Sequence, residues 1–176
     1  MSPFRPDLVD VWSFRLPQGS SPAVDSSAGG SPKVEILLMR RAAGRILPGL
    51  WQCVSGSLEA GESITDGALR ELVEETAFGP DEIEAFYDLD QVNQFHEPTM
   101  GGIATSAIFC VRVGAGAEPT LSPEHDAMRW VSPEEALRLA IWPAYRESIR
   151  RIVDNLVDPE RAIWFELTLS GERARQ

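Results

Sequence analysis

Lysine is almost absent from this 176-residue chain, in which Lys33 is the single example, and the acids outnumber the bases so far that the formal net charge is −11. A protein that binds a nucleic acid polymer needs a basic stripe to displace counterions from the phosphates, and no block of Lys and Arg occurs here. We therefore expect no nucleic acid polymer as a partner. Acidity does suit a protein that concentrates divalent cations, although many proteins are acidic for solubility alone.

Long apolar runs and cysteines are also scarce. No stretch approaches 18 apolar residues, so no membrane span and no membrane partner are predicted. The first residues, MSPFRPDLVDVW, contain an early acid and no uninterrupted apolar run, which is unlike a signal peptide. Cys53 and Cys110 are too few for a disulfide scaffold, so both are expected as buried thiols. These absences predict a cytoplasmic protein.

The chain does contain alternating strand-like and helix-like segments, and its length suits a single domain over residues 1–176. Strands are expected at 8–16, 33–41, within 50–59, and at 84–97, 102–113, 125–132 and 162–169. Helices are expected after Ser63, after Ser132 and over 142–157. Residues 17–32, rich in Gly, Ser and Pro, read as a flexible loop insertion, and 158–176 as a strand with a polar tail whose pairing is open. The mixture predicts an α/β fold with a mixed sheet.

An acidic segment, GSLEAGESITDGALRELVEETAF at 56–78, is the most unusual feature. It holds six carboxylates and one base, Arg70. At about 100° per residue, Glu71, Glu74 and Glu75 fall within one arc of the expected helix. Like charges at this spacing repel, and a bound cation such as Mg²⁺ reverses the sign of that interaction. A solvated acidic helix is the alternative. The neighbouring arc, expected to face the sheet, contains Ala68, Leu69, Leu72, Val73 and Thr76.

The spacing within this segment resembles the signature of the Nudix hydrolase family, Gly-x5-Glu-x7-Arg-Glu-apolar-x-Glu-Glu-x-Gly-apolar. Six fixed matches arise by chance with a probability of about 10⁻⁵ over such a chain. The one departure is Ala77 in place of the late glycine, and alanine does not adopt a positive φ without cost. We therefore expect a different turn, with Gly79 ending the helix. The matching residues are Gly56, Glu62, Arg70, Glu71, Leu72, Glu74, Glu75 and Phe78.

The flanking sequences, LWQCVSGSLEAGES and EHDAMRWVSPEEAL, are most similar to the dihydroneopterin triphosphate and dATP pyrophosphatase branch of this family. The resemblance covers roughly residues 8–157 and implies an α/β/α sandwich around a mixed β-sheet. It also implies Mg²⁺-dependent hydrolysis, with Mn²⁺ as a substitute, of a nucleoside or pterin triphosphate to pyrophosphate and a monophosphate. The alternatives are a dinucleoside polyphosphate or nucleotide-sugar hydrolase and, in another class, a non-catalytic nucleotide-binding module. A homodimer is left open.

The resemblance also implies roles for individual residues. The metal ligands would be the carbonyl of Gly56 and the carboxylates of Glu71, Glu74 and Glu75, with Glu124 added from a loop. Arg70 would hold the acids in place by pairing with Glu62. The general base is left open between Glu124, Glu97 and a glutamate of the signature.

Substrate contacts are expected on the strands and the last helix. One of Arg40 and Arg41 would meet a phosphate. Trp51 would either stack on a base or pack at the sheet edge, and Gln52 would read a base edge. Trp142 and Arg146, four residues apart, resemble a tryptophan–arginine pair near the pocket of the branch named above. The alternative is that the tryptophan only docks the helix on the sheet. The two histidines, His96 and His125, are expected at the surface or as caps.

Overall fold

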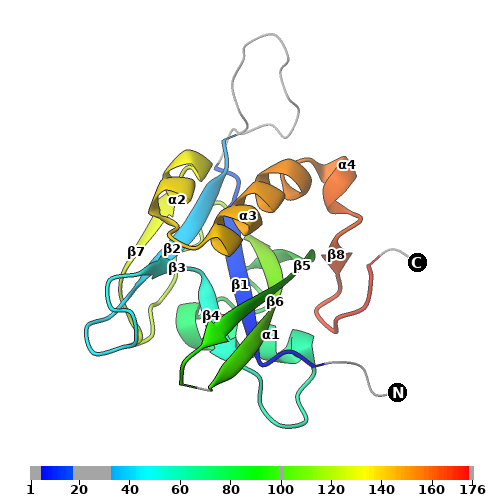
Figure 1. The fold of residues 1–176 in the computed structure, drawn as a ribbon. Helices are drawn as coiled ribbons and strands as arrows, with labels where there is room; N and C mark the ends of the chain where they lie inside the picture. The colour runs from blue at the N-terminus through cyan, green and yellow to red at the C-terminus, as the bar shows by residue number, and fades with distance from the viewer. Residues whose placement is uncertain (1–4, 18–32, 100, 175–176) are drawn as a thin grey trace.

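The computed structural model describes residues 5–17, 33–99 and 101–174 (Figure 1). The predicted loop at 17–32 lies outside these ranges from residue 18 onward. The strands are β1 (Leu8–Arg15), β2 (Glu35–Arg41), β3 (Trp51–Gln52), β4 (Val54–Ser57), β5 (Ile83–Glu97), β6 (Gly102–Val113), β7 (His125–Val131) and β8 (Glu166–Leu167). The helices are α1 (Ile64–Thr76), α2 (Pro133–Leu139), α3 (Pro143–Arg151), the π-helical turn η1 (Ile152–Leu156) and α4 (Pro159–Ala162).

The described strands form one mixed sheet of eight strands. Its central order is β3-β2-β1-β6-β5-β8, and β4 pairs with β1 while β7 pairs with β2. The central pair β1 and β6 is parallel, whereas the other pairs are antiparallel. The prediction of a mixed sheet is therefore confirmed.

Helices cover both faces of this sheet, with α1 on one face and α2, α3 and α4 on the other (Figure 1). Side-chain alternation along β1 builds both cores, because Val9 and Val11 point toward α1 while Trp12 and Phe14 point toward the other helices. The predicted α/β/α sandwich is confirmed. Cys53 and Cys110 are both free and buried, as expected.

Helix α1 begins as predicted and ends differently. The Ser63 hydroxyl accepts a hydrogen bond from the Asp66 amide at 3.1 Å. The prediction that Gly79 ends the helix is wrong, since Ala77 itself takes the left-handed conformation, with φ at 61°, and donates to the Val73 carbonyl. The predicted buried arc is also partly wrong: Val73 is exposed, and Glu75 is buried in its place.

The C-terminal third departs further from the predictions. The expected helix over 142–157 changes from α to π geometry at Ile152. The expected strand over 162–169 is mostly replaced, because Asp158 caps α4 and Pro159 starts it, so that Ala162 ends this helix and residues 163–165 form a turn. Only β8 remains as a strand, and it pairs with β5 of its own sheet. Among the described residues, no helix is both long and apolar enough to cross a membrane.

Candidate active site

Arg70 lies at the centre of the acidic segment and binds several carboxylates at once. Its Nε and Nη2 donate to the two carboxylate oxygens of Glu62 at 2.8 and 3.1 Å, so the predicted pairing is present. Its Nη1 donates to Glu71 at 2.9 Å and to Glu74 at 3.2 Å. The Arg70 hydrogen bonds lower the pKa of Glu62 to about 2. Arg70 therefore fixes the exposed side of the acidic segment.

Glu71 lies against the backbone of Gly56 on β4. A Cβ atom at position 56 would overlap the Glu71 carboxylate, so only glycine allows this approach. Burial raises the pKa of Glu71, an effect that Arg70 opposes. The requirement for glycine in the signature thus has a steric cause here.

Glu75 is the buried member of the acidic group, with 4% of its surface exposed. Burial raises its pKa to about 8, and the charges of Glu71 and Glu124 add to that rise. Its Oε2 atom is buried without a hydrogen-bond partner among the described residues. An unpaired carboxylate oxygen inside a folded protein is costly unless a ligand completes it.

His125 lies beside Glu75, with its Nδ1 at 3.7 Å from Glu75 Oε2. Gln52 bridges toward it, since its amide nitrogen lies 3.4 Å from His125 Nε2 and its amide oxygen accepts from Arg41 at 3.4 Å. Burial lowers the pKa of His125, and the Arg41 charge adds to this effect. The expectation of a surface or capping role is wrong for His125, which is buried, although His96 is exposed as expected.

We define the carboxylate cluster as Glu71, Glu74, Glu75 and Glu124. Within the described part of the chain, no three His, Cys, Asp or Glu side chains converge closely enough to hold a metal ion, and Arg70 draws Glu71 and Glu74 toward itself. The residues present nevertheless fit a hard divalent cation. Glu75 offers a buried unpaired oxygen, and burial, together with the charges of neighbouring acids, raises the pKa values of Glu71 and Glu75.

The two loop acids considered as general base lie in different surroundings. Glu124 precedes β7, pairs with Arg45 at 3.2 Å, and is close enough to raise the pKa values of Glu71 and Glu75. Glu97 instead accepts hydrogen bonds from the amide and hydroxyl of Thr99 at 2.9 and 2.7 Å, which lower its pKa. Glu97 therefore serves the β5–β6 turn, and the geometry favours Glu124.

The predicted substrate residues do not form one group. Arg40 pairs with Asp126 at 2.6 Å, and its guanidinium lies 5.8 Å from the Trp51 ring centre. Arg129, which the sequence did not single out, lies closer to that ring, at 4.9 Å. Arg41 points instead toward Gln52 and the buried histidine. The structure thus separates the two neighbouring arginines, with Arg41 on the side of the carboxylate cluster.

The predicted tryptophan–arginine pair lies at the start of α3. Trp142 precedes the helix and has 42% of its surface exposed, so it is not buried as a docking residue. Arg146 donates from Nε to the Ala140 carbonyl at 2.8 Å and therefore braces the turn between α2 and α3.

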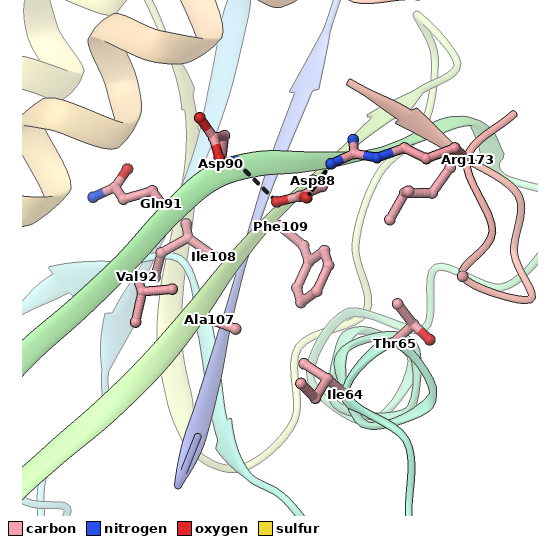
Figure 2. Close-up of a pocket in the computed structure, with 12 residues that line it drawn as sticks. Ile64, Thr65, Asp88, Asp90, Gln91, Val92, Ala107, Ile108, Phe109 and Arg173 are labelled. Atoms are coloured by element: carbon pink, nitrogen blue, oxygen red, sulfur yellow. Dashed lines mark hydrogen bonds and ion pairs between the residues drawn. The ribbon is translucent and has the colours of Figure 1, made fainter. Parts of the chain in front are cut away.

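Figure 2 shows a cavity of about 440 Å³ that borders the first turn of α1, β5 and β6. Arg173 closes one side by pairing with Asp88 at 2.8 Å. None of the predicted site residues line this cavity, which lies at Ile64 and Thr65 rather than along the second half of α1. It is therefore separate from the carboxylate cluster.

Comparison with known proteins identifies the family of the chain. Residues 26–152 match the family model of the NUDIX domain. The sequence is 36% identical over 125 residues to an octanoyltransferase of Myxococcus xanthus, an alignment that covers 70% of this chain and 33% of that protein. The chain thus spans about a third of that relative. It is also 29% identical over 137 residues to an RNA pyrophosphohydrolase of Dinoroseobacter shibae, covering 66% of this chain and 85% of that protein.

Solved structures agree with this match at the level of the fold. A NUDIX hydrolase from Listeria monocytogenes has a TM-score of 0.69 at 23% identity, over 86% of this chain and 94% of that chain. The dihydroneopterin triphosphate pyrophosphohydrolase of E. coli has a TM-score of 0.62 at 22% identity, over 83% and 94%. With the family model spanning most of the sequence and with all acids of the signature present on α1 or just before it, the chain belongs to the Nudix hydrolase family.

Proposed function

We propose that this protein hydrolyses a phosphoanhydride bond of a nucleoside or pterin triphosphate in the presence of Mg²⁺, releasing pyrophosphate and a monophosphate. Mn²⁺ would substitute for Mg²⁺. The observation that supports this most is Glu75, a buried carboxylate with an unpaired oxygen beside two further acids. Such an arrangement destabilises the fold unless a cation completes it, so it is best explained by a metal-dependent activity.

The ligands of this cation would be the carboxylate cluster and the Gly56 carbonyl. When bound, a divalent cation there neutralises phosphate charge and lowers the pKa of an attacking water. Other residues of the chain position the carboxylates that would bind the cation. Arg70 keeps Glu71 and Glu74 in place, and Gly56 lets the Glu71 carboxylate approach the strand.

Proton removal from the attacking water is assigned to Glu124. It is the member of the cluster that comes from a loop, and within the described part of the chain its carboxylate pairs with Arg45. Both side chains are part-exposed, so both can reach a phosphate chain bound at the cluster. Arg41 and Arg45 would then contact the phosphates, whereas Arg40 is engaged with Asp126 and Trp51.

The test is a substrate panel with Mg²⁺ in which pyrophosphate, orthophosphate and the monophosphate are quantified separately. The panel contains the eight common nucleoside triphosphates, dihydroneopterin triphosphate, a dinucleoside polyphosphate, a nucleotide sugar and a 5′-triphosphorylated RNA. Pyrophosphate and a monophosphate in equal amounts from a triphosphate support the proposal. Cleavage of only the dinucleotide or the nucleotide sugar would assign the alternative hydrolase activity, and cleavage of only the RNA would overturn the expectation of a small substrate.

A binding module without turnover is the remaining alternative. It predicts a calorimetric binding signal for a triphosphate and Mg²⁺ with no product after prolonged incubation. All acids of the signature are present in this chain, which argues against that outcome.

A further inference from the structure

A row of four polar side chains crosses the sheet on the face covered by α3. Asp10 of β1 lies opposite Ser55 of β4, and Ser106 of β6 lies opposite Asn93 of β5. Ser106 pairs with Leu8, two residues before Asp10, so Asp10 and Ser106 point to the same face. We call these four residues the polar row.

The polar row interrupts a face that is otherwise apolar. Trp12, Ile108 and Cys110 surround it, and all three belong to the core beneath α3. Asp10 is 5% exposed and Ser106 is 1% exposed. The Ser55 and Ser106 hydroxyls lie close enough to favour the charged form of Asp10, but Ser106 Oγ has no hydrogen-bond partner within the described ranges. The Ser106 hydroxyl is therefore buried polar capacity that the described part of the fold does not use.

Helix α3 and its neighbours keep the outer end of the row in place. Gln91 donates to the Asn93 side-chain oxygen at 2.8 Å and to the Ala144 carbonyl of α3 at 3.1 Å. Ser148 of α3 donates to the side-chain oxygen of Gln91 at 3.0 Å. Asn93 is thus oriented by the packing of α3 on β5.

Exposed aromatic rings lie near this end. Phe95 follows Asn93 by two residues on the same face of β5 and is 40% exposed. Trp142 precedes α3 and is exposed to a similar extent. A planar ring that entered from this side would meet apolar surfaces as well as the polar row.

The inner end of the row adjoins the carboxylate cluster. The Ser55 backbone amide hydrogen-bonds to Glu75, and the next residue, Gly56, lies against Glu71. A molecule whose phosphates lie at the cluster could therefore reach the row with its ring system. The polar row and the carboxylate cluster are adjacent because Ser55 and Gly56 both belong to the short strand β4.

We propose that Asp10 is a specificity-determining residue, which accepts paired hydrogen bonds from a ring N–H and the adjacent 2-amino group, the edge that guanine and pterins share. This inference rests on the proposed triphosphate hydrolysis and names its substrate class. An ionised carboxylate only accepts hydrogen bonds, and this ring edge places a ring N–H beside an amino group. Adenine places an acceptor beside its amino group and suits a carboxylate less well.

The experiment compares dGTP, dITP and dATP as substrates with Mg²⁺. The base of dITP differs from that of dGTP only by the missing 2-amino group, which isolates the contact assigned to Asp10. The wild-type protein is expected to favour dGTP over dITP by at least about tenfold in kcat/KM, mostly through KM. In Asp10→Asn the preference should fall to within about threefold, because the amide replaces one acceptor oxygen with a donor.

Ser13→Ala is the matched control. Ser13 lies in the same strand and is also buried with an unpaired hydroxyl, but it points to the opposite face. It should keep the wild-type preference. Equal use of dGTP and dITP by the wild-type protein would overturn the inference, and so would an unchanged preference in Asp10→Asn.

Failure of this inference is distinguishable from failure of the proposed function. Pyrophosphate release without any preference for the 2-amino group refutes only the role of Asp10. If no triphosphate is cleaved, the proposed function fails, and calorimetric Kd values for the α,β-methylene analogues of dGTP and dITP still test the inference. A dGTP analogue that binds no tighter than the dITP analogue would contradict it.

Discussion

The carboxylate cluster and the polar row both contain buried acids, yet the two regions are built in opposite ways. In the cluster, Glu75 lies beside His125, and the negative charges of Glu71 and Glu124 act on its buried carboxylate. In the polar row, Asp10 is surrounded by neutral hydroxyls and apolar side chains. The first environment attracts a cation, whereas the second attracts neutral N–H donors.

This difference indicates that two buried acids in different surroundings can have different roles in one site. The cluster would govern how fast a phosphoanhydride is cleaved, and the row would govern which ring is accepted. Changes in one region should therefore leave the property governed by the other region intact. Mutations in the two regions test this separation.

Glu75→Gln should lower turnover of every accepted triphosphate by at least about 100-fold, equivalent to about 2.7 kcal/mol, because it removes a charge from the cluster. The ratio of dGTP to dITP cleavage should not change. Steady-state kinetics measure both quantities. Glu97→Gln makes the same chemical change on the β5–β6 hairpin and should keep full activity. Full Mg²⁺-dependent activity in Glu75→Gln would remove Glu75 from the cluster's function.

Asp10→Asn should stabilise the fold at alkaline pH. Burial raises the pKa of Asp10 to about 6 from 3.8. The folded protein then binds this proton more tightly than the unfolded chain, so the contribution of Asp10 to stability is present below pH 3.8 and is lost as the pH rises through 6. Relative to wild type, Asp10→Asn should gain about 1–3 kcal/mol between pH 4.5 and 8.

Urea unfolding at both pH values measures this gain, with Ser13→Ala as the control. An equal difference between Asp10→Asn and wild type at the two pH values would mean that Asp10 carries no buried charge. A gain in stability together with lost selectivity would show that the polar row is kept for function.

Gly56→Ala should lower turnover by about tenfold, equivalent to about 1.4 kcal/mol, while the fold is kept. The new Cβ overlaps the end of the flexible Glu71 side chain, which can move away at the expense of its position in the cluster. Kinetics and a thermal melt measure the two effects. Gly116→Ala, where a Cβ meets nothing within 4 Å, should change neither. Unchanged turnover in Gly56→Ala would show that the position of Glu71 does not matter.

Ala77→Gly should stabilise the protein by about 0.5–1 kcal/mol and change neither turnover nor selectivity. Ala77 holds a left-handed conformation at the end of α1, which glycine adopts without steric cost. Chemical denaturation measures the gain. A loss of stability would show that the methyl group of Ala77 contributes more through packing than it costs through strain.

Much of this arrangement is predictable from the sequence, because local spacing determines it. The signature fixes Arg70 and Glu71 on one helix and Glu62 just before it, and the cap at Ser63 fixes where that helix begins. The C-terminal strand is mispredicted because the cap at Asp158 and the start at Pro159 override the apolar pattern over 162–169. Short capped turns override hydrophobic patterns of this length.

The residues that the sequence does not reveal are those placed by long-range pairing. In β1, both alternating faces contain large apolar residues, so the pattern alone does not reveal the surroundings of Asp10, which is buried on the same face as Trp12 beneath α3. His125 has no characteristic spacing to Glu75, since the two meet through the contact between β7 and the end of α1. Its position next to Glu124 at the start of a strand is the one signal in the sequence.

The central claim, that the crowded glutamates share a divalent cation, is tested most directly by titrating Mn²⁺ into the nucleotide-free protein and following free Mn²⁺ by electron paramagnetic resonance. The wild-type protein and Glu97→Gln are predicted to bind Mn²⁺ with equal affinity, and Glu75→Gln to bind it at least about tenfold more weakly. Equal binding by all three proteins, or no binding by any of them at millimolar Mn²⁺, would contradict the claim.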